Sequence, residues 1–258
     1  MKNLAKLGTL TACVLLASNL EAKDAVDPGQ ADNTWVVGIG AGAINNPYAG
    51  EDNETIVIPR IRYNGERFFF NEKGLGLNLF TRSEWSGGLI VRGDGSFLHD
   101  AKEFRSNPKL AGLRERDIAI EAGLYINHTS DMGRLRFTAL NDVSNTHKGQ
   151  TAEIEYIFDM EYGDWHINPY AGVSWISDDK ADHHFGVRAN EVTDSRALYK
   201  ADSSFSFNTG VSGRYSFNKN WDFTFNTGYS RLGSGITDSP IIEDKNIYYG
   251  TVGVNYNF

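Results

Sequence analysis

His128 and Ser130, in the stretch NHTS, are the residues whose spacing points most directly to catalysis. A histidine near a serine can act as a general base and activate the hydroxyl for attack on a lipid ester. That chemistry also needs a third residue to orient the histidine. The stretch TSDMG that follows at 129–133 is typical of a tight turn. A polar turn is therefore favoured over a lipid hydrolase.

Aspartate and histidine residues form a second group, made up of Asp178, Asp179, Asp182, His183 and His184. Such side chains can activate a water molecule or bind a metal ion. Adjacent histidines on an extended segment point in opposite directions, however, and nothing in this stretch fixes the geometry of a ligand set. We expect a solvated loop here and assign no catalytic residue, metal or cofactor.

Charged residues at alternate positions form a third group. They are Glu153, Glu155, Asp159 and Glu161 on one segment and Arg134 and Arg136 on the segment before it. On two paired strands these acids and arginines face the same side. Ion pairs between them would rigidify a wall, whereas an open water-filled pore would screen them. A structural network is favoured over a lining selective for cations.

The secondary structure that carries these residues is clearest in the segment WHINPYAGVSW, residues 165–175. Because strand side chains alternate with period two, Trp165, Val173 and Trp175 share one face, and His166 lies on the other. The two tryptophans are about 33 Å apart along a strand. If the strand is tilted by about 40°, the two tryptophans are about 25 Å apart along the membrane normal, which is the height of the apolar band of a transmembrane barrel.

Further segments alternate in the same way, which predicts an all-β fold, a transmembrane antiparallel up-and-down β-barrel. Twelve strands are expected, at 33–43, 55–63, 66–71, 75–81, 86–93, 116–127, 133–142, 150–162, 165–177, 203–217, 220–231 and 246–258. The segments 66–71 and 75–81 are short, and their fusion would lead to a barrel of ten strands. An even count puts both termini in the periplasm.

Aromatic residues at strand ends are expected to form the girdles at the membrane interfaces. The predicted girdle residues are Trp35, Trp85, Trp165, Trp175, Trp221 and Tyr229. The chain ends in TVGVNYNF, whose outward face would consist of Val252, Val254, Tyr256 and Phe258. We expect this last strand to direct insertion through the barrel-assembly machinery.

The N-terminus is typical of a signal peptide. Lys2 and Lys6 precede an apolar run at 7–17, which is too short to span a bilayer. Cleavage after Ala22 divides the chain into a signal peptide, 1–22, and a single barrel domain, 23–258; acylation at Cys13 is the disfavoured alternative. The mature chain would lack cysteine and carry 23 basic and 32 acidic residues, a net charge of −9. This balance disfavours a nucleic-acid partner.

A basic stretch interrupts this acidic chain at 94–117, with Lys102, Arg105, Lys109, Arg114 and Arg116. On an outward loop these residues could contact the phosphates of lipopolysaccharide. Ordinary solvated loop charges are an equally good interpretation.

Motifs along the whole mature chain carry a family resemblance. They are NPYAG (46–50), IPRIRYNGERFFF (58–70), NDVSNTHKGQ (141–150), PYAGVSW (169–175), HFGVRANE (184–191), RLGSGITDSPII (231–242) and the final GVNYNF. In this order the chain resembles the MltA-interacting protein (MipA/OmpV) family of Gram-negative outer-membrane proteins. The family usually has aromatic residues where His183 and His184 stand.

The resemblance implies a non-enzymatic barrel in the outer membrane, in contact with its lipid and lipopolysaccharide. It also implies a scaffold that links a murein lytic transglycosylase to a peptidoglycan synthase. Two alternatives remain: a narrow pore for small solutes, and a surface adhesin or lipid hydrolase acting through the long loops. The family has no established functional residues to transfer to this chain.

Overall fold

A computed structural model describes residues 33–94 and 107–258. The predicted signal peptide, Lys102 and Arg105 lie outside these residues. The strands are β1 (Thr34–Ile44), β2 (Glu54–Asn64), β3 (Phe68–Asn71), β4 (Gly74–Arg82), β5 (Trp85–Asp94), β6 (Ala119–Ser130), β7 (Gly133–Asp142), β8 (Gln150–Phe158), β9 (Met160–Tyr162), β10 (Trp165–Ile176), β11 (Ser204–Ser216), β12 (Trp221–Arg231) and β13 (Asn246–Asn257). Within the described ranges, no helix is long and apolar enough to cross a membrane.

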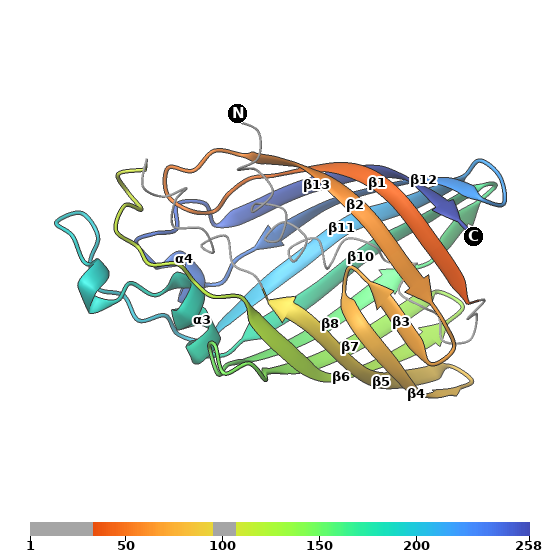
Figure 1. Ribbon diagram of the computed structural model, residues 1–258, viewed down its shortest axis with the longest axis horizontal. Helices are drawn as coiled ribbons and strands as arrows, with labels where there is room; N and C mark the ends of the chain where they lie inside the picture. Colours follow the sequence, from red (N-terminus) through yellow and green to blue (C-terminus); the bar gives the residue numbers. More distant parts are fainter. Residues whose placement is uncertain (1–32, 95–106) are drawn as a thin grey trace.

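The strands form one antiparallel sheet that closes on itself (Figure 1). Closure comes from β1 and β13, which pair from Val36 with Asn257 to Ile44 with Tyr249. β10 pairs with both β8 and β9, so these two are one strand interrupted at Asp159. The barrel thus has twelve strands, as predicted, and the ten-strand alternative is wrong because β3 and β4 pair as separate strands.

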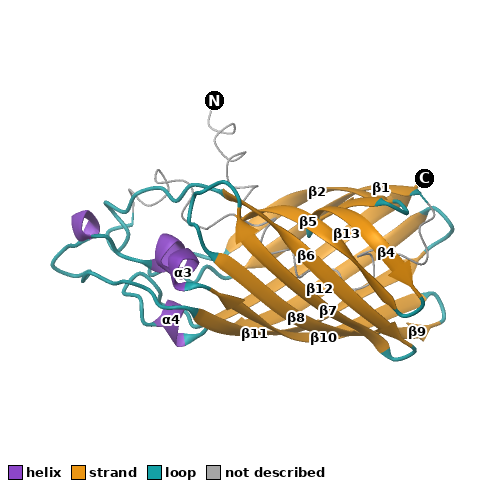
Figure 2. Cartoon of the chain, turned by 90° about the horizontal axis from the view of Figure 1, so that it is seen from below, coloured by secondary structure: helices purple, strands orange, loops and turns teal. Residues whose placement is uncertain are grey.

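The two ends of the barrel differ (Figure 2). The tight turns after β2, β4, β6, β9 and β11 and both described chain ends lie at one end, here the turn end, whereas the β3–β4 turn points the opposite way. Gly133, with a φ of 145°, ends the two-residue turn between β6 and β7, a conformation that glycine adopts readily. The long connections and the short helices α3 (Asp178–Phe185), η3 (Ala189–Glu191) and α4 (Ser234–Thr237) lie at the opposite, loop end.

Exposure along the strands is the reverse of that in a soluble protein. On β2, Val57 and Ile61 are 59% and 53% exposed on the outside, whereas Arg60 and Arg62 are 5% and 0% exposed inside. An apolar exterior around a polar interior is the pattern of a barrel that spans a membrane. The backbone pairs around most of the closed sheet, which removes much of the cost of exposing its polar groups to lipid; beside β2 the described residues pair with β3 at Tyr63 and Asn64 alone.

The predicted girdle residues lie at the two ends of this apolar band. Trp35, Trp85 and Trp221 are about half exposed at the turn end, and Trp165 opens β10 there. At the other limit of the band, Trp175 and Tyr229 stand near the loop-end limits of β10 and β12. On the last strand, Val252 and Val254 are exposed outward, Tyr256 is half-buried, and Phe258, just after β13, is 73% exposed.

Candidate functional site

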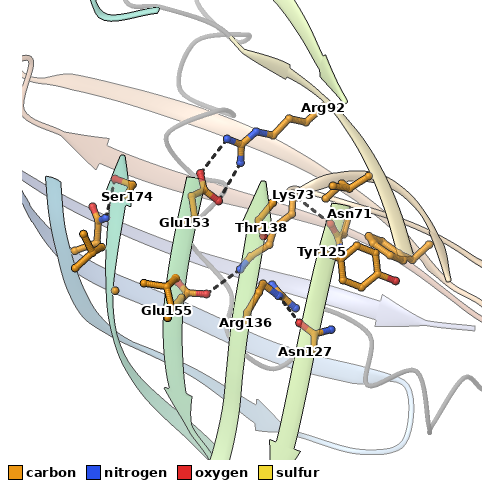
Figure 3. A pocket seen from close by; sticks show the side chains of 16 residues that line it. Asn71, Lys73, Arg92, Tyr125, Asn127, Arg136, Thr138, Glu153, Glu155 and Ser174 are labelled. Atoms are coloured by element: carbon orange, nitrogen blue, oxygen red, sulfur yellow. Dashed lines mark hydrogen bonds and ion pairs between the residues drawn. The ribbon is translucent and has the colours of Figure 1, made fainter. Parts of the chain in front are cut away.

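The lumen contains a cavity with about 730 Å³ of empty space, part of it open to solvent (Figure 3). Phe69, Ile90 and Tyr125 line it with apolar surface, and Phe69 meets Tyr125 edge-on at 5.6 Å. Five charged residues also line it: Lys73, Arg92, Arg136, Glu153 and Glu155. A concave site that combines apolar and charged groups is typical of a small-ligand pocket.

Three elements bring the cations to the cavity. Lys73 stands in the tight turn between β3 and β4, and its Nζ lies 3.1 Å from Glu155 on β8. Arg92 on β5 places Nη2 2.9 Å from Glu153 and Nε 3.2 Å from Glu121. Arg136 on β7 donates from Nε to Asn127 Oδ1 at 2.9 Å. Both carboxylates of β8 are therefore bound by cations from distant strands.

Beyond the cavity, other side chains cross the lumen. Arg60 on β2 donates to Thr224 on β12. The hydroxyls of Tyr170 on β10 and Tyr249 on β13 are 2.7 Å apart, and Tyr170 also donates to Asn226 at 3.3 Å. These contacts join strands that are not neighbours in the sheet. They fill part of the lumen with hydrogen-bonded side chains.

The predicted charge network differs from the observed one in its partners and its extent. Arg136 stands opposite Glu155 and Arg134 opposite Ile157 in the β7–β8 register, and both arginines are buried. Glu155 nevertheless pairs with Lys73, which looks like an ordinary turn residue in the sequence. Arg92 could have been found from its alternation with the outward Leu89 and Val91, but its partner could not.

Asp159 and Glu161 do not belong to the cavity, contrary to the prediction of one continuous acidic stripe. The register with β10 is the same on both sides of Asp159, from Ile157 with Tyr170 to Glu161 with His166, but Asp159 and Glu161 lie near the turn end and are exposed. Asp159 accepts from the side chain of Asn168 at 3.2 Å. Glu161, with a 65% exposed side chain, pairs with His166 at 3.1 Å.

A buried charge cluster lies where the lumen meets the loop end. The side chain of Glu121 is fully buried, and Lys180 of α3 places Nζ 2.7 Å from Glu121 and 3.2 Å from Asp94. His184 Nε2 is 2.8 Å from the same Asp94 carboxylate. Thr151 donates to Glu121 at 2.8 Å. These contacts anchor α3 on the barrel.

The prediction of a solvated loop at 178–184 is therefore wrong. Ser177 caps a helix, because its hydroxyl accepts from the backbone N–H of Lys180. Asp178 and Asp179 in the first turn and the histidines in the last turn suit the helix dipole. The helix turns Lys180 and His184 inward, onto the barrel.

Asp94, His147 and His184 place one ligand atom each within 4.8 Å of one another, a spacing that could hold a metal ion. His147 Nδ1, however, accepts from the backbone N–H of Gly149 at 2.9 Å. The neutral ring then carries its proton on Nε2, the nitrogen that faces Asp94 at 3.5 Å. Because Lys180 already supplies a positive charge, the arrangement fits an ion-pair cluster better than a metal site.

The loops above this cluster pack into a cap with its own apolar core. Its buried residues are Tyr48, Leu110, Leu113, Val187 and Ile241, which come from four connections. Arg116 and Glu191, whose side chains are both 0% exposed, form an ion pair of 2.8 Å beside this core. Burial alone would raise the pKa of Glu191, but hydrogen bonds from Arg116 and two backbone N–H groups lower it to about 2.

Two of the described basic residues proposed for lipopolysaccharide contact, Lys109 and Arg116, form ion pairs within the cap. Arg116 is buried against Glu191, and Arg114 N donates to the same carboxylate at 3.0 Å. Lys109 is exposed and pairs with Glu243 at 2.7 Å. Lys109 and Arg114 are the exposed basic residues of this stretch, among those that the structure describes.

His128 and Ser130 lie at the turn end of β6, as the sequence suggested. His128 stacks on Trp85 at 4.5 Å, and its Nδ1 is 4.0 Å from Glu84. The Ser130 hydroxyl donates to the carbonyl of Gly133 at 3.1 Å. The serine is thus engaged in its own turn.

The turn end carries more acidic than basic exposed residues in the described part of the chain. On the turns and adjoining strand ends the acids are Glu66, Glu84, Asp131, Asp159, Glu161 and Asp164, and the bases are Arg67, Arg82 and Lys219. Met132 and Tyr162 are 72% and 84% exposed among them. We call this surface the turn rim.

Proteins of a known family are similar to this chain in sequence. The model of the family described as MltA-interacting protein MipA matches residues 37–258. Outer membrane protein Omp26La of Vibrio anguillarum is 27% identical, over 96% of this chain and 97% of its own. MltA-interacting protein of Escherichia coli (strain K12) is 25% identical, over 96% of this chain and 100% of its own.

Among solved structures, an outer membrane channel from Pseudomonas putida F1 is 11% identical. It covers 90% of this chain and 100% of its own, with a TM-score of 0.43. A likeness this distant says nothing of function. The match to the family model over most of the chain, together with the twelve-strand barrel, assigns this outer-membrane protein to the MltA-interacting protein MipA family.

Proposed function

We propose that this protein is a non-catalytic interaction protein whose periplasmic turn rim contacts a peptidoglycan-remodelling enzyme, a murein lytic transglycosylase or synthase. The observation that carries the proposal is the set of side chains crossing the lumen: Lys73 to Glu155, Arg60 to Thr224 and Tyr170 to Tyr249. A lumen bridged in this way favours an interaction role over free passage of solutes. Short turns of outer-membrane barrels face the periplasm.

The turn rim supplies features that suit a protein partner. Tyr162 and Met132 are large, exposed side chains on neighbouring hairpins, and acidic residues surround them. Exposed aromatic residues are frequent anchors of protein interfaces. The surplus of acids favours a partner with a basic surface, which the rim would attract electrostatically. A relative of this chain bears the name MltA-interacting protein.

The non-catalytic part of the proposal is supported by the engagement of Ser130 with Gly133. A nucleophilic serine has to be hydrogen-bonded to its base. We expect the purified barrel to release no fatty acid from phospholipid vesicles. Steady release that is abolished in the variant His128→Ala would contradict this part.

The interaction is tested by pull-down from Gram-negative envelopes, with the N-terminally tagged mature barrel as bait and detection of lytic transglycosylase and peptidoglycan synthase. The rim variant carries Glu84→Lys, Asp131→Lys and Asp164→Lys. The matched control carries the same charge change at the loop end, on exposed acids outside the helices: Asp52→Lys, Glu115→Lys and Asp194→Lys. We expect the rim variant to lose the partner and the control to retain it. Failure of the wild-type barrel to recover any murein enzyme, or equal recovery by both variants, would overturn the proposal.

A further inference from the structure

The barrel wall is incompletely paired on one side of β2. β2 pairs with β1 along its whole length, from Glu54 to Asn64. On its other side it pairs with β3 at Tyr63 and Asn64 alone, among the residues that the structure describes. β3 is four residues long and turns back into β4 at Glu72 and Lys73 (Figure 1). A gap in the hydrogen-bonded wall follows, between β2 and the β3–β4 hairpin.

The sequence contains an independent sign of this gap. Pro59 stands in the middle of β2, within its unpaired part. Proline has no backbone N–H and is found in sheets essentially at edges and bulges. The outward side chains of this part, such as Val57 and Ile61, are exposed and apolar, so the gap opens within the lipid-facing band.

An ion pair crosses the gap near its turn end. Arg62 of β2 donates from Nε to both carboxylate oxygens of Glu72, at 2.7 and 2.9 Å. The Arg62 side chain is 0% exposed and that of Glu72 is 22% exposed. The bond therefore ties the free end of the hairpin to β2 from inside the wall.

The cavity lies directly behind the hairpin. Its lining includes Phe69 and Asn71 of β3 and Lys73 of the turn. Part of its empty space, about 730 Å³, is open to solvent. Phe69, Ile90 and Tyr125 supply contiguous apolar surface, because they belong to one buried cluster.

One cation of the cavity is available to an anion. The lining holds three cations and two carboxylates, and Glu121, outside the lining, also pairs with Arg92, so an anion site rests on Arg136 and not on a net positive charge. Lys73 and Arg92 are paired with Glu155 and Glu153, whereas Arg136 forms no ion pair with a described carboxylate. Arg136 is 9% exposed, and its Nη1 is buried without a hydrogen-bond partner. Such an orphaned guanidinium nitrogen is costly unless a ligand acceptor fills it.

We propose that an anionic amphiphile with a single acyl chain enters from the membrane through the gap between β2 and the β3–β4 hairpin and binds in this cavity. Arg136 binds the anionic head, and Phe69, Ile90 and Tyr125 contact the chain. The Arg62–Glu72 pair holds the gap closed between binding events. This binding site is distinct from the turn rim and does not depend on it.

Binding is tested with radiolabelled dodecanoate and the mature barrel in phosphatidylcholine nanodiscs. Loss of one hydrogen bond to a charged group predicts that Arg136→Gln weakens binding at least about tenfold. The matched control is Arg134→Gln, a buried arginine on the same strand and face that does not line the cavity. It should bind as the wild type does. Dodecanol, which has the chain without the charge, should bind both arginine variants equally.

Entry through the gap is tested by a reversible crosslink. The sole cysteine of the natural chain, Cys13, lies in the predicted signal peptide, so Arg62→Cys and Glu72→Cys can be bridged by a bifunctional methanethiosulfonate. The bridge should slow dodecanoate exchange at least about tenfold, and reduction should restore it; Glu72→Gln alone should speed exchange. Absence of dodecanoate binding to the wild type, or equal binding by Arg136→Gln, would overturn the site. Unchanged exchange in the bridged protein would overturn the route.

Discussion

The cap has a buried apolar core, whereas the interior of the lumen is polar. The cap resembles the core of a soluble protein, since Leu110 and Ile241 are 0% exposed and Arg116 has a buried carboxylate partner. The lumen is polar, and its cavity leaves a guanidinium nitrogen of Arg136 without a hydrogen bond. The difference indicates that the cap is a packed core with a paired charge, whereas Arg136 in the lumen forms no ion pair with a carboxylate of the described residues.

The cluster between the two regions should respond most strongly to mutation. Lys180→Met would leave the carboxylates of Glu121 and Asp94 without their ammonium partner. The packing of α3 on the barrel should lose about 3–5 kcal/mol of stability as a result. Hydrogen exchange of residues 178–185 measures the effect. The exposed Lys200 provides the control, and Lys200→Met should leave exchange unchanged. Normal protection in Lys180→Met would show that the cluster does not anchor the cap.

Removal of apolar contacts should open the cap without affecting the barrel. Leu110→Ala creates a cavity in a fully buried position and should cost about 2–5 kcal/mol of cap stability. Limited proteolysis within residues 186–199 should accelerate, while the melting of the β-sheet stays unchanged. Leu198→Ala, at a 65% exposed position in this segment, should have little effect. Loss of the whole barrel in Leu110→Ala would show that the two regions fold as one unit.

A polar deletion in the lumen should be milder. Tyr170→Phe removes the hydroxyl that meets Tyr249 and Asn226, which should cost about 1–3 kcal/mol. Urea unfolding of the barrel in detergent checks this value. A cost as large as that of Leu110→Ala in the cap would indicate that the crossing tyrosines, rather than the sheet, hold the barrel together.

Acid should loosen the cap in two steps. Burial lowers the pKa of His183 to about 4, so the folded cap favours the neutral ring, and stability falls as pH drops from about 6.5 to about 4. Glu191, with its pKa lowered to about 2, adds a loss that begins near pH 4.3 and continues to about pH 2. Hydrogen exchange of residues 178–191 against pH measures both. His183→Asn should remove the first step and keep the second.

The exposed pair Lys109–Glu243 should contribute least. Both side chains are 56% exposed, and water and salt screen such pairs. Lys109→Ala should leave cap exchange unchanged at physiological salt. A marked loss of protection would mean that surface charges, not the apolar core, hold the loops together.

The wall could be predicted from the sequence because alternation with period two is a local property. The pattern from Trp165 to Trp175, for example, matches β10 directly. The position of Asp159 outside the cavity escaped prediction because alternation gives the face of a strand and not the height in the barrel at which a side chain stands. The helix α3 could have been found from Ser177 and the two aspartates after it, which form an N-terminal capping pattern.

Partners across the lumen could not be predicted, because they depend on strands that are far apart in the chain. Lys73 meets Glu155, 82 residues away, only because the β3–β4 hairpin is short. The cap core likewise joins Tyr48 to Ile241 through loops that carry no periodic pattern. Tertiary packing alone determines such contacts, and a single sequence does not encode them locally.

Conductance of the purified mature barrel in a planar lipid bilayer tests most directly whether the lumen is sealed. At neutral pH and moderate salt we expect no steady current, because the cap closes the loop end and side chains cross the lumen below it. Lys180→Met, which frees α3, should give at most brief openings. A steady ohmic conductance of the wild type, reduced on neutralising Glu153 and Glu155, would contradict the seal and indicate a pore.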